Sequence, residues 1–235
     1  MFRNRNKIGV LLVGLLMVST VSAQNLSDDL KAIGQSIDSA KSVVISSKIK
    51  VYARKGGEVM YATEASLKRS GEISHTIIDA MEYYDNASYL MSIDHEDKEV
   101  TVISKEKNKK KIPNNAAFDL KSLEKLFETD ESSQKPVVKQ LSSVNGIVTY
   151  SVSKITGLKE LKIVLNTNDR TLVSLSYEYS ENSEYKGQYI EVSYTKFELN
   201  TDVLGSLKQS NFFTISNSKV VLNSKYKSYT IQSEL

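Results

Sequence analysis

The chain opens with a basic segment that leads into an uninterrupted apolar run. Arg3, Arg5 and Lys7 precede the eleven residues Ile8–Val18, and small residues follow up to Ala23. Eleven helical residues rise only about 16 Å, roughly half the thickness of a bilayer's hydrocarbon core. The pattern therefore predicts a cleavable signal peptide over residues 1–23 rather than a membrane span, with a short buried helix as the alternative.

After this leader the apolar residues first follow a helical period and then a period of two. Leu26, Leu30 and Ile33 lie on one stripe and predict a helix over residues 25–41. From Val43 onward, alternation of apolar and polar residues predicts about five antiparallel strands in direct succession. The turns between them are expected at Gly56-Gly57, Ser70-Gly71, Asp85-Asn86 and Asp94–Lys98, with Glu72–Tyr84 as one strand.

The only two prolines of the chain, Pro113 and Pro136, bracket a second helical pattern. Its apolar residues are Phe118, Leu120, Leu123, Leu126 and Phe127. After Pro136 about six strands are expected, with hairpin signals at Asn145-Gly146, Asn166–Asp169 and Glu181–Gly187. A short helix is expected around Asp202–Gln209, before a last pair of strands at Phe213–Leu222 and Lys225–Gln232.

This order of elements predicts a mainly β (α+β) fold. An antiparallel sheet of ten or eleven strands cannot stay flat, because strand twist makes it curl or split. We therefore expect a strongly curved antiparallel sheet, an incomplete β-barrel whose helices plug the concave face. Residues 24–235 are expected to form this single domain, and a closed barrel or a two-sheet sandwich is the alternative.

Composition and charge narrow the functional classes. Hydrophobic residues make up 40% of the chain and charged residues 25%, which is typical of a globular protein. Lys and Arg number 31 against 28 Asp and Glu, and the excess of three lies in residues 1–23, so the remainder balances at 28 to 28. No nucleic acid is therefore expected as a partner. The absence of cysteine excludes a disulfide, a thiol nucleophile and an acylated cysteine anchor.

The sequence offers no evident catalytic centre. His95 lies in the acidic stretch Asp94–Asp97, which fits either a metal site or, as we favour, a polar hairpin turn. His75 lies in a predicted strand and is expected to be packed or at a sheet edge. No nucleophile elbow or phosphate-binding glycine loop is present, so we expect no enzyme, no catalytic residue, no metal and no cofactor. A hydrolase that uses paired strand carboxylates is the minority alternative.

Two basic features remain open to more than one interpretation. The run Lys105–Lys111 contains five lysines and is either a solvated connector or a docking patch for anionic lipid headgroups or an acidic partner. Strand parity places Arg69 on the face of Val59, Tyr61 and Leu67. Burying an unpaired guanidinium is costly, so Arg69 is expected either to pair with the carbonyls at a helix end or to point to water beside the following turn.

Three segments resemble the periplasmic lipoprotein carrier family, LolA and its relatives. They are Leu67–Ile73 (LKRSGEI), Tyr84–Leu90 (YDNASYL) and Tyr189–Phe213. The resemblance covers most of residues 26–215 and implies an incomplete antiparallel barrel whose helices close a hydrophobic cavity. It also implies that Arg69 hydrogen-bonds the lid and helps to hand on the cargo. Ser70 stands where the family usually has proline and Ile73 where it has an aromatic residue, and the cargo stays open.

These features favour an exported, soluble periplasmic carrier that shields acyl chains in a cavity between a curved sheet and lid helices. Its expected partners are an acylated protein or a lipid, with envelope proteins and transient membrane-surface contact in addition. The alternative is a non-enzymatic cell-envelope scaffold or adaptor of the same fold that binds a protein. The expected cavity residues are Val51, Val59, Tyr61, Leu67, Arg69 and Ile73 on strands, and Phe118, Leu123 and Phe127 on the helix between the prolines.

Overall fold

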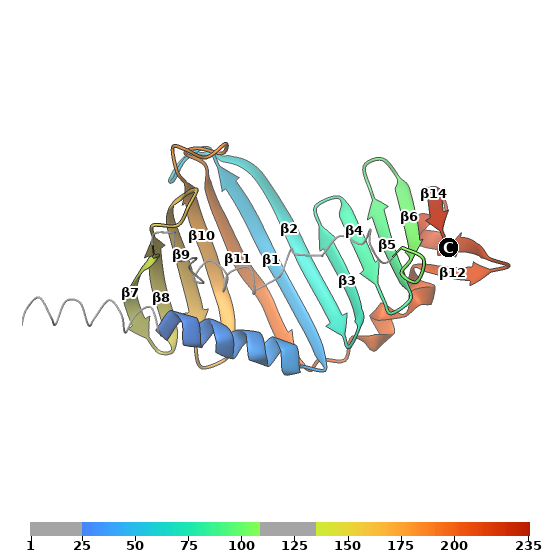
Figure 1. Cartoon of the computed structure of the whole chain (residues 1–235), viewed down its shortest axis with the longest axis horizontal. Helices are drawn as coiled ribbons and strands as arrows, with labels where there is room; N and C mark the ends of the chain where they lie inside the picture. The colour runs from blue at the N-terminus through green and yellow to red at the C-terminus, as the bar shows by residue number, and fades with distance from the viewer. Residues whose placement is uncertain (1–24, 109–134) are drawn as a thin grey trace, which may run out of the picture. The chain divides into compact units, whose positions relative to one another are not determined.

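A computed structural model describes residues 25–108 and 135–235 of the chain (Figure 1). The predicted signal peptide and the helix expected between the two prolines lie outside these residues. In the described part, the only α-helix spans residues 25–39, and no helix is long and apolar enough to cross a membrane.

Fourteen strands are present in the described residues. They are β1 (Ser42–Tyr52), β2 (Val59–Ser70), β3 (Ile73–Ile78), β4 (Met81–Asp85), β5 (Tyr89–Asp94), β6 (Glu99–Ser104), β7 (Val137–Val144), β8 (Ile147–Ser153), β9 (Leu158–Asn166), β10 (Thr171–Tyr179), β11 (Tyr189–Leu199), β12 (Phe213–Ser216), β13 (Lys219–Leu222) and β14 (Thr230–Glu234). Three 3-10 helices accompany them near the end of the chain: η2 (Leu204–Leu207), η3 (Gln209–Asn211) and η4 (Ser224–Tyr226).

Twelve of the strands form one sheet in the order β14-β6-β5-β4-β3-β2-β1-β11-β10-β9-β8-β7. Its two edge strands, β14 and β7, do not pair with each other, so the sheet is not closed into a barrel. The prediction of a mainly β chain with an incomplete barrel is confirmed. β12 and β13 pair with each other in a separate two-stranded sheet.

Residue contacts divide the described chain into two compact units. Unit 1 contains residues 25–38, 50–61 and 135–193. Its helix crosses the strands of this unit (Figure 1) and buries Leu26, Leu30 and Ile33 almost completely. The hydroxyl of Tyr150 on β8 donates to Asp29 of the helix at 2.8 Å, which fixes the helix against the sheet. The helical spacing of the apolar residues is therefore the pattern of its buried face.

Unit 2 contains residues 39–49, 62–108 and 194–235. Its core is a cluster in which sheet residues meet side chains from the end of the chain. Phe212, Phe213 and Tyr226 are at most 3% exposed and pack on strands β4–β6. The sheet side of the cluster consists of Tyr84, Met91, Ile93, Val100 and Val102. The C-terminal segment is thus part of the core of unit 2.

Several predicted turns are confirmed, and their chemistry explains why. Asn145 and Gly146 join β7 to β8 with φ angles of 52° and 80°, the left-handed geometry that two-residue hairpins require. A Cβ atom on Gly146 would lie 2.3 Å from the Asn168 side chain, so a larger residue at this position would require that side chain to move. Gly71, with φ of 57°, lies in the turn between β2 and β3.

Three details differ from the sequence prediction. Glu72–Tyr84 is not one strand but the hairpin β3–β4, which turns at Asp79-Ala80 with Asp79 at a φ of 55°. Phe213–Leu222 is likewise a hairpin, β12–β13, rather than one strand. The last strand, β14, does not pair with it but lies parallel to β6, so the sheet is not purely antiparallel. Neither hairpin turn contains glycine or proline. Because no such residue marks these turns, the alternation of apolar and polar residues predicted one continuous strand in each case.

Candidate functional site

Unit 2 contains a pocket of about 610 Å³ between strands β3 and β4 and the 3-10 helix η2. Apolar side chains supply most of its lining. Ile73 comes from β3, Tyr84 from β4, and Leu204 and Leu207 from η2. Leu207 is buried, whereas Leu204 is 58% exposed. The pocket therefore combines a fixed apolar floor with an apolar side chain that is accessible from solvent.

The polar side of the pocket is organised by Asn86, which follows β4 and is itself nearly buried. Its Oδ1 accepts the main-chain N–H groups of Ser88 and Tyr89, both at 2.8 Å, and closes the turn to β5. Its Nδ2 donates to Oε1 of Gln209 on η3 at 3.1 Å. This amide pair joins the sheet to the 3-10 segment that forms the opposite wall. The exposed charged residues of the lining are Glu72 and Lys208.

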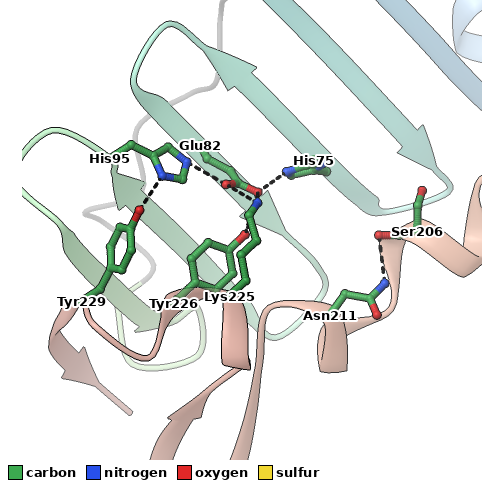
Figure 2. A network of polar contacts seen from close by, with 8 residues as sticks. All are labelled: His75, Glu82, His95, Ser206, Asn211, Lys225, Tyr226 and Tyr229. Atoms are coloured by element: carbon green, nitrogen blue, oxygen red, sulfur yellow. Dashed lines mark hydrogen bonds and ion pairs between the residues drawn. The ribbon is translucent and has the colours of Figure 1, made fainter.

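The pocket wall formed by the 3-10 helices η2 and η3 is also stabilised by hydrogen bonds within this segment. Nδ2 of Asn211 donates to the main-chain oxygen of Gly205 at 2.9 Å. It also donates to the main-chain oxygen of Ser206 at 3.2 Å (Figure 2). Beneath η2, Leu207 packs with Val44 and Val203 in a small buried cluster that Ile73 also contacts. The pocket wall is consequently a short but internally bonded segment.

An aromatic stack connects the pocket to the interior of unit 2. The ring of Tyr84 lies 4.2 Å from the ring of Phe212 in a stacked arrangement. Phe212 in turn meets His75 edge-on, with centroids 4.9 Å apart. Burial raises the pKa of Tyr84, so its hydroxyl stays protonated. The side chains behind the pocket therefore lead directly to a buried polar cluster.

That cluster centres on Glu82, whose side chain is 1% exposed (Figure 2). Nε2 of His75 lies 2.7 Å from one carboxylate oxygen, and Nε2 of His95 lies 2.8 Å from the other. The hydroxyl of Tyr226 donates to Glu82 at 2.8 Å, and Nζ of Lys225 lies 3.2 Å from Oε2. Both histidines of the chain thus converge on a single buried carboxylate.

The charge state of Glu82 follows from these contacts. Burial by itself would raise the pKa of the carboxyl group, but hydrogen bonds from His75 and Tyr226 and the charge of Lys225 outweigh it. The pKa of Glu82 is lowered from 4.5 to about 2. Burial, together with the bond to Glu82, raises the pKa of Tyr226. Glu82 is therefore ionised at neutral pH and acts as acceptor for every donor around it.

The Glu82 cluster joins segments that are far apart in the sequence. His75 lies on β3 and Glu82 on β4, and His95 follows β5. Tyr226 and Tyr229 belong to the C-terminal segment, and the Tyr229 hydroxyl lies 2.9 Å from Nδ1 of His95. Because Tyr226 bonds to the carboxylate directly and Tyr229 bonds to it through His95, the cluster is an anchor for the C-terminal segment. Across the described residues, no group of three His, Cys, Asp or Glu side chains is placed to bind a metal ion.

The sequence interpretations of the two histidines are confirmed. Asp94 Oδ1 accepts the main-chain N–H groups of Glu96 and Asp97 at 2.9 and 3.1 Å, so this acidic stretch forms the predicted hairpin turn. His75 is packed, with its side chain 13% exposed.

The structure separates the expected cavity residues of unit 2. The register of β2 and β3 pairs Arg69 with Ser74 and places Leu67 and Arg69 on one face of the sheet. Ile73 pairs with Ser70, so it lies on the opposite face. Of these three residues only Ile73 lines the pocket. Leu67 and Arg69 are both half-buried on the other face.

The remaining expected cavity residues are in unit 1 or outside the described chain. Val59 is 48% and Tyr61 44% exposed on β2, and Val51 on β1 is half-buried. The candidates between the prolines, Phe118, Leu123 and Phe127, lie outside the described residues. The role of all these side chains in a cavity stays a prediction.

Sequence reasoning did not identify Asn86, Leu204, Leu207 or the Glu82 cluster. One signal for Glu82 was available, because it alternates with Tyr84 in a strand and so falls on a face expected to be apolar. A carboxylate at such a position needs buried donors. Asn86 was a second signal, because the side-chain oxygen of an asparagine can accept main-chain N–H groups two or three residues later and so close a turn.

No family model and no curated protein matches the sequence. Among solved structures, an uncharacterized conserved protein from Thermus thermophilus aligns with 89% of this chain and 99% of its own, at TM-score 0.47 and 4% identity. Lipoprotein LppX from Mycobacterium tuberculosis aligns with 77% of this chain and 97% of its own, at TM-score 0.39 and 7% identity.

A LolA superfamily protein from Nitrosomonas europaea aligns with 76% of this chain and 96% of its own, at TM-score 0.29 and 8% identity. A LolA superfamily protein is thus among the solved structures with which this chain aligns, at a TM-score below 0.5.

Proposed function

We propose that the chain is an exported, non-enzymatic carrier that shields the acyl chain of a lipid or of an acylated protein in the pocket of unit 2. The observation that carries this proposal is the pocket itself. Its volume of about 610 Å³ falls within the roughly 300–1,000 Å³ of small-molecule sites, and its lining is mainly apolar. The predicted leader at residues 1–23 and the resemblance to periplasmic lipoprotein carriers support export and the class of cargo.

The energetics of an acyl chain explain why such a carrier is needed. Each buried methylene is worth about 0.8 kcal/mol, so a chain of some sixteen carbons costs on the order of 12 kcal/mol to expose to water. A lipid therefore crosses an aqueous compartment only when a protein covers its apolar part. The side chains of Ile73, Tyr84, Leu204 and Leu207 would cover the part of such a chain that lies in the pocket.

The pocket wall also suits release of the cargo. One side consists of the short 3-10 helices η2 and η3 rather than of sheet. Short 3-10 segments with exposed residues open at a lower free energy than paired strands. Glu72 and Lys208 are exposed on the lining, where a polar headgroup remains in contact with water.

A fluorescent fatty acid tests the proposal. Its binding to the 235-residue chain is measured by titration, and Leu204→Asp is compared with the parent. Losing the contact of the ligand with one leucine side chain weakens the binding free energy by about 1.5–3 kcal/mol. Leu204→Asp is therefore expected to raise the dissociation constant roughly tenfold to a hundredfold. Val221→Asp is the matched control, because Val221 on β13 is 50% exposed, similar to Leu204, and does not line the pocket.

Two results contradict the proposal. One is a parent chain that takes up no fatty acid and carries no lipid-sized mass in native mass spectrometry. The other is binding that Leu204→Asp and Val221→Asp reduce equally, because the ligand would then not occupy this pocket.

The adaptor function is the alternative, and one observation favours it. Val59, Met60 and Tyr61 are successive residues of β2 in unit 1 and are 48%, 61% and 44% exposed. Val59 and Tyr61 lie on the same face of the sheet, and exposed apolar side chains that lie together on one face are typical of surfaces that bind another protein. Failure of the fatty acid titration would leave this function as the better account.

A further inference from the structure

The last strand of the sheet, β14, contributes little side-chain burial. All five of its residues, Thr230–Glu234, are exposed. The strand before it in the sheet order, β6, contains Val100 and Val102, which are completely buried. The main-chain groups of β14 therefore account for most of what holds it to β6.

The pairing of β14 with β6 is also the less favourable kind. The two strands run parallel, whereas every other strand pair of the sheet with a described register is antiparallel. Parallel pairing is slightly less stable per residue. The register sets Ile231 opposite Val100 and Ser233 opposite Val102. Ser233 therefore leaves the buried Val102 without an apolar partner on the β14 side, whereas Met91 on β5 is its partner on the other side.

The chain just before β14 is, by contrast, firmly anchored. Tyr226 is 1% exposed and bonds to Glu82, and Tyr229 bonds to His95 (Figure 2). Beyond Tyr229 the five residues of β14 are exposed, whereas Leu235 is half-buried and packs against the core of unit 2. Displacement of β14 therefore releases the contact of Leu235 but leaves the Glu82 cluster in place.

We propose that the edge of β6 is a binding site for an extended peptide segment of a partner protein, which displaces β14 and adds in its place. A strand edge supplies affinity through main-chain hydrogen bonds and specificity through alternate side chains. The partner segment runs parallel to β6. It presents apolar residues where Ile231, Ser233 and Leu235 stand, because these positions share the face of Val100 and Val102.

A lysine that follows β6 indicates the chemistry of the far end of the partner segment. The Nζ of Lys107 contacts the main-chain oxygen of Leu235, directly after β14. A segment that follows the β14 path therefore reaches the Lys107 ammonium group, which favours an acidic residue after its apolar ones. Lys109–Lys111 of the basic run lie outside the described residues.

A reversible lock tests the proposal on the whole chain. Thr101 and Gln232 are directly paired in the register, and the chain has no cysteine of its own. The double variant Thr101→Cys/Gln232→Cys closes a single disulfide that fixes β14 on β6 when oxidised and frees it when reduced. The probe is a dye-labelled synthetic peptide of residues 229–235 that carries Ser233→Val. A matched peptide with proline at positions 232 and 233 cannot form the ladder.

Fluorescence anisotropy is expected to show that the reduced variant and the parent bind the probe, and that oxidation weakens binding by at least about tenfold. The proline peptide is expected not to bind. The proposal is overturned if the oxidised and reduced variants bind equally, or if the parent does not bind the probe. It is also overturned if the reduced variant sediments as a dimer that the oxidised variant does not form, since the edge would then take a second copy.

Hydrogen exchange on the parent chain gives an independent readout. The amide protons of β14 are expected to exchange well before those of β5, because β14 opens while the core stays closed. Exchange of β14 in step with β5 would show that the strand leaves only on global unfolding, which contradicts displacement.

Discussion

Replacing Glu82 by glutamine tests whether the buried carboxylate holds the C-terminal segment on the sheet. Glutamine has nearly the same shape as glutamate, so the variant removes the charge and leaves the packing of unit 2 largely unchanged. Its NH2 group replaces either the oxygen that His75 and Tyr226 approach at 2.7 and 2.8 Å or the oxygen that His95 and Lys225 approach at 2.8 and 3.2 Å. At least one of these hydrogen bonds is therefore lost.

The magnitude follows from the pKa of Glu82. A pKa of about 2 against an ordinary 4.5 means that the fold favours the charged carboxylate by about 3 kcal/mol, at roughly 1.4 kcal/mol per pKa unit. The Glu82→Gln variant is expected to lose about that much free energy of unfolding at pH 7. This agrees with the roughly 3–5 kcal/mol lost when one partner of a buried ion pair is removed.

Urea denaturation followed by circular dichroism measures this difference. The matched control is Glu64→Gln, because Glu64 pairs with Lys48 in an ion pair whose Glu64 side chain is 76% exposed. That variant is expected to change the free energy of unfolding by less than about 0.5 kcal/mol. The reasoning is refuted if Glu82→Gln costs less than about 1 kcal/mol, or no more than Glu64→Gln.

The same carboxylate predicts a dependence of stability on pH. A group whose pKa is lower in the folded than in the unfolded chain stabilises the fold above the unfolded value, and this contribution is lost as the pH falls through the folded value. For Glu82 the loss runs from about pH 4.5 to about pH 2. The parent chain and Glu82→Gln are therefore expected to converge in stability at the acid end of this range. A constant difference at every pH would contradict this prediction.

Three further substitutions test the fold. Gly146→Ala is expected to lower the free energy of unfolding by about 1 kcal/mol or more, because position 146 has a φ of 80° and a Cβ there would displace the Asn168 side chain. Gly205→Ala, in open space, is expected to be nearly neutral. Leu26→Ala is expected to cost about 2–5 kcal/mol through a cavity beneath the helix, and a cost near zero would mean that the helix is not packed. Tyr150→Phe is expected to lower the free energy of unfolding by about 1 kcal/mol, because it removes the hydrogen bond to Asp29. Thermal unfolding measures the change for each of these variants.

The elements that sequence predicted well are those whose signal is local. The stripe of Leu26, Leu30 and Ile33 defines the buried face of the helix, and all three are at most 2% exposed. Asn145-Gly146 carries the residues that a left-handed turn requires. The β3–β4 turn at Asp79-Ala80 contains no glycine, proline or asparagine. The alternation of apolar residues on both sides of this turn therefore predicted a single strand where the structure has a hairpin.

The candidate site was harder to predict because its geometry depends on register and on distant contacts. The two-residue turn Gly71-Glu72 pairs Ser70 with Ile73, which places Ile73 on the face opposite to Arg69. Counting alternate residues along a single strand does not show which residues of the next strand share its face. The partners of Glu82 are as far as 144 positions away in the sequence, as Tyr226 is, so no local pattern marks them.

The most direct test of the carrier account is where a fatty acid binds on the chain. A spin-labelled stearate is titrated into the isotope-labelled protein, and the broadening of amide resonances is mapped by NMR. The account predicts that broadening is strongest around the pocket, at Ile73, Asn86, Leu207 and Gln209. An absence of broadening, or broadening confined to unit 1, would contradict it.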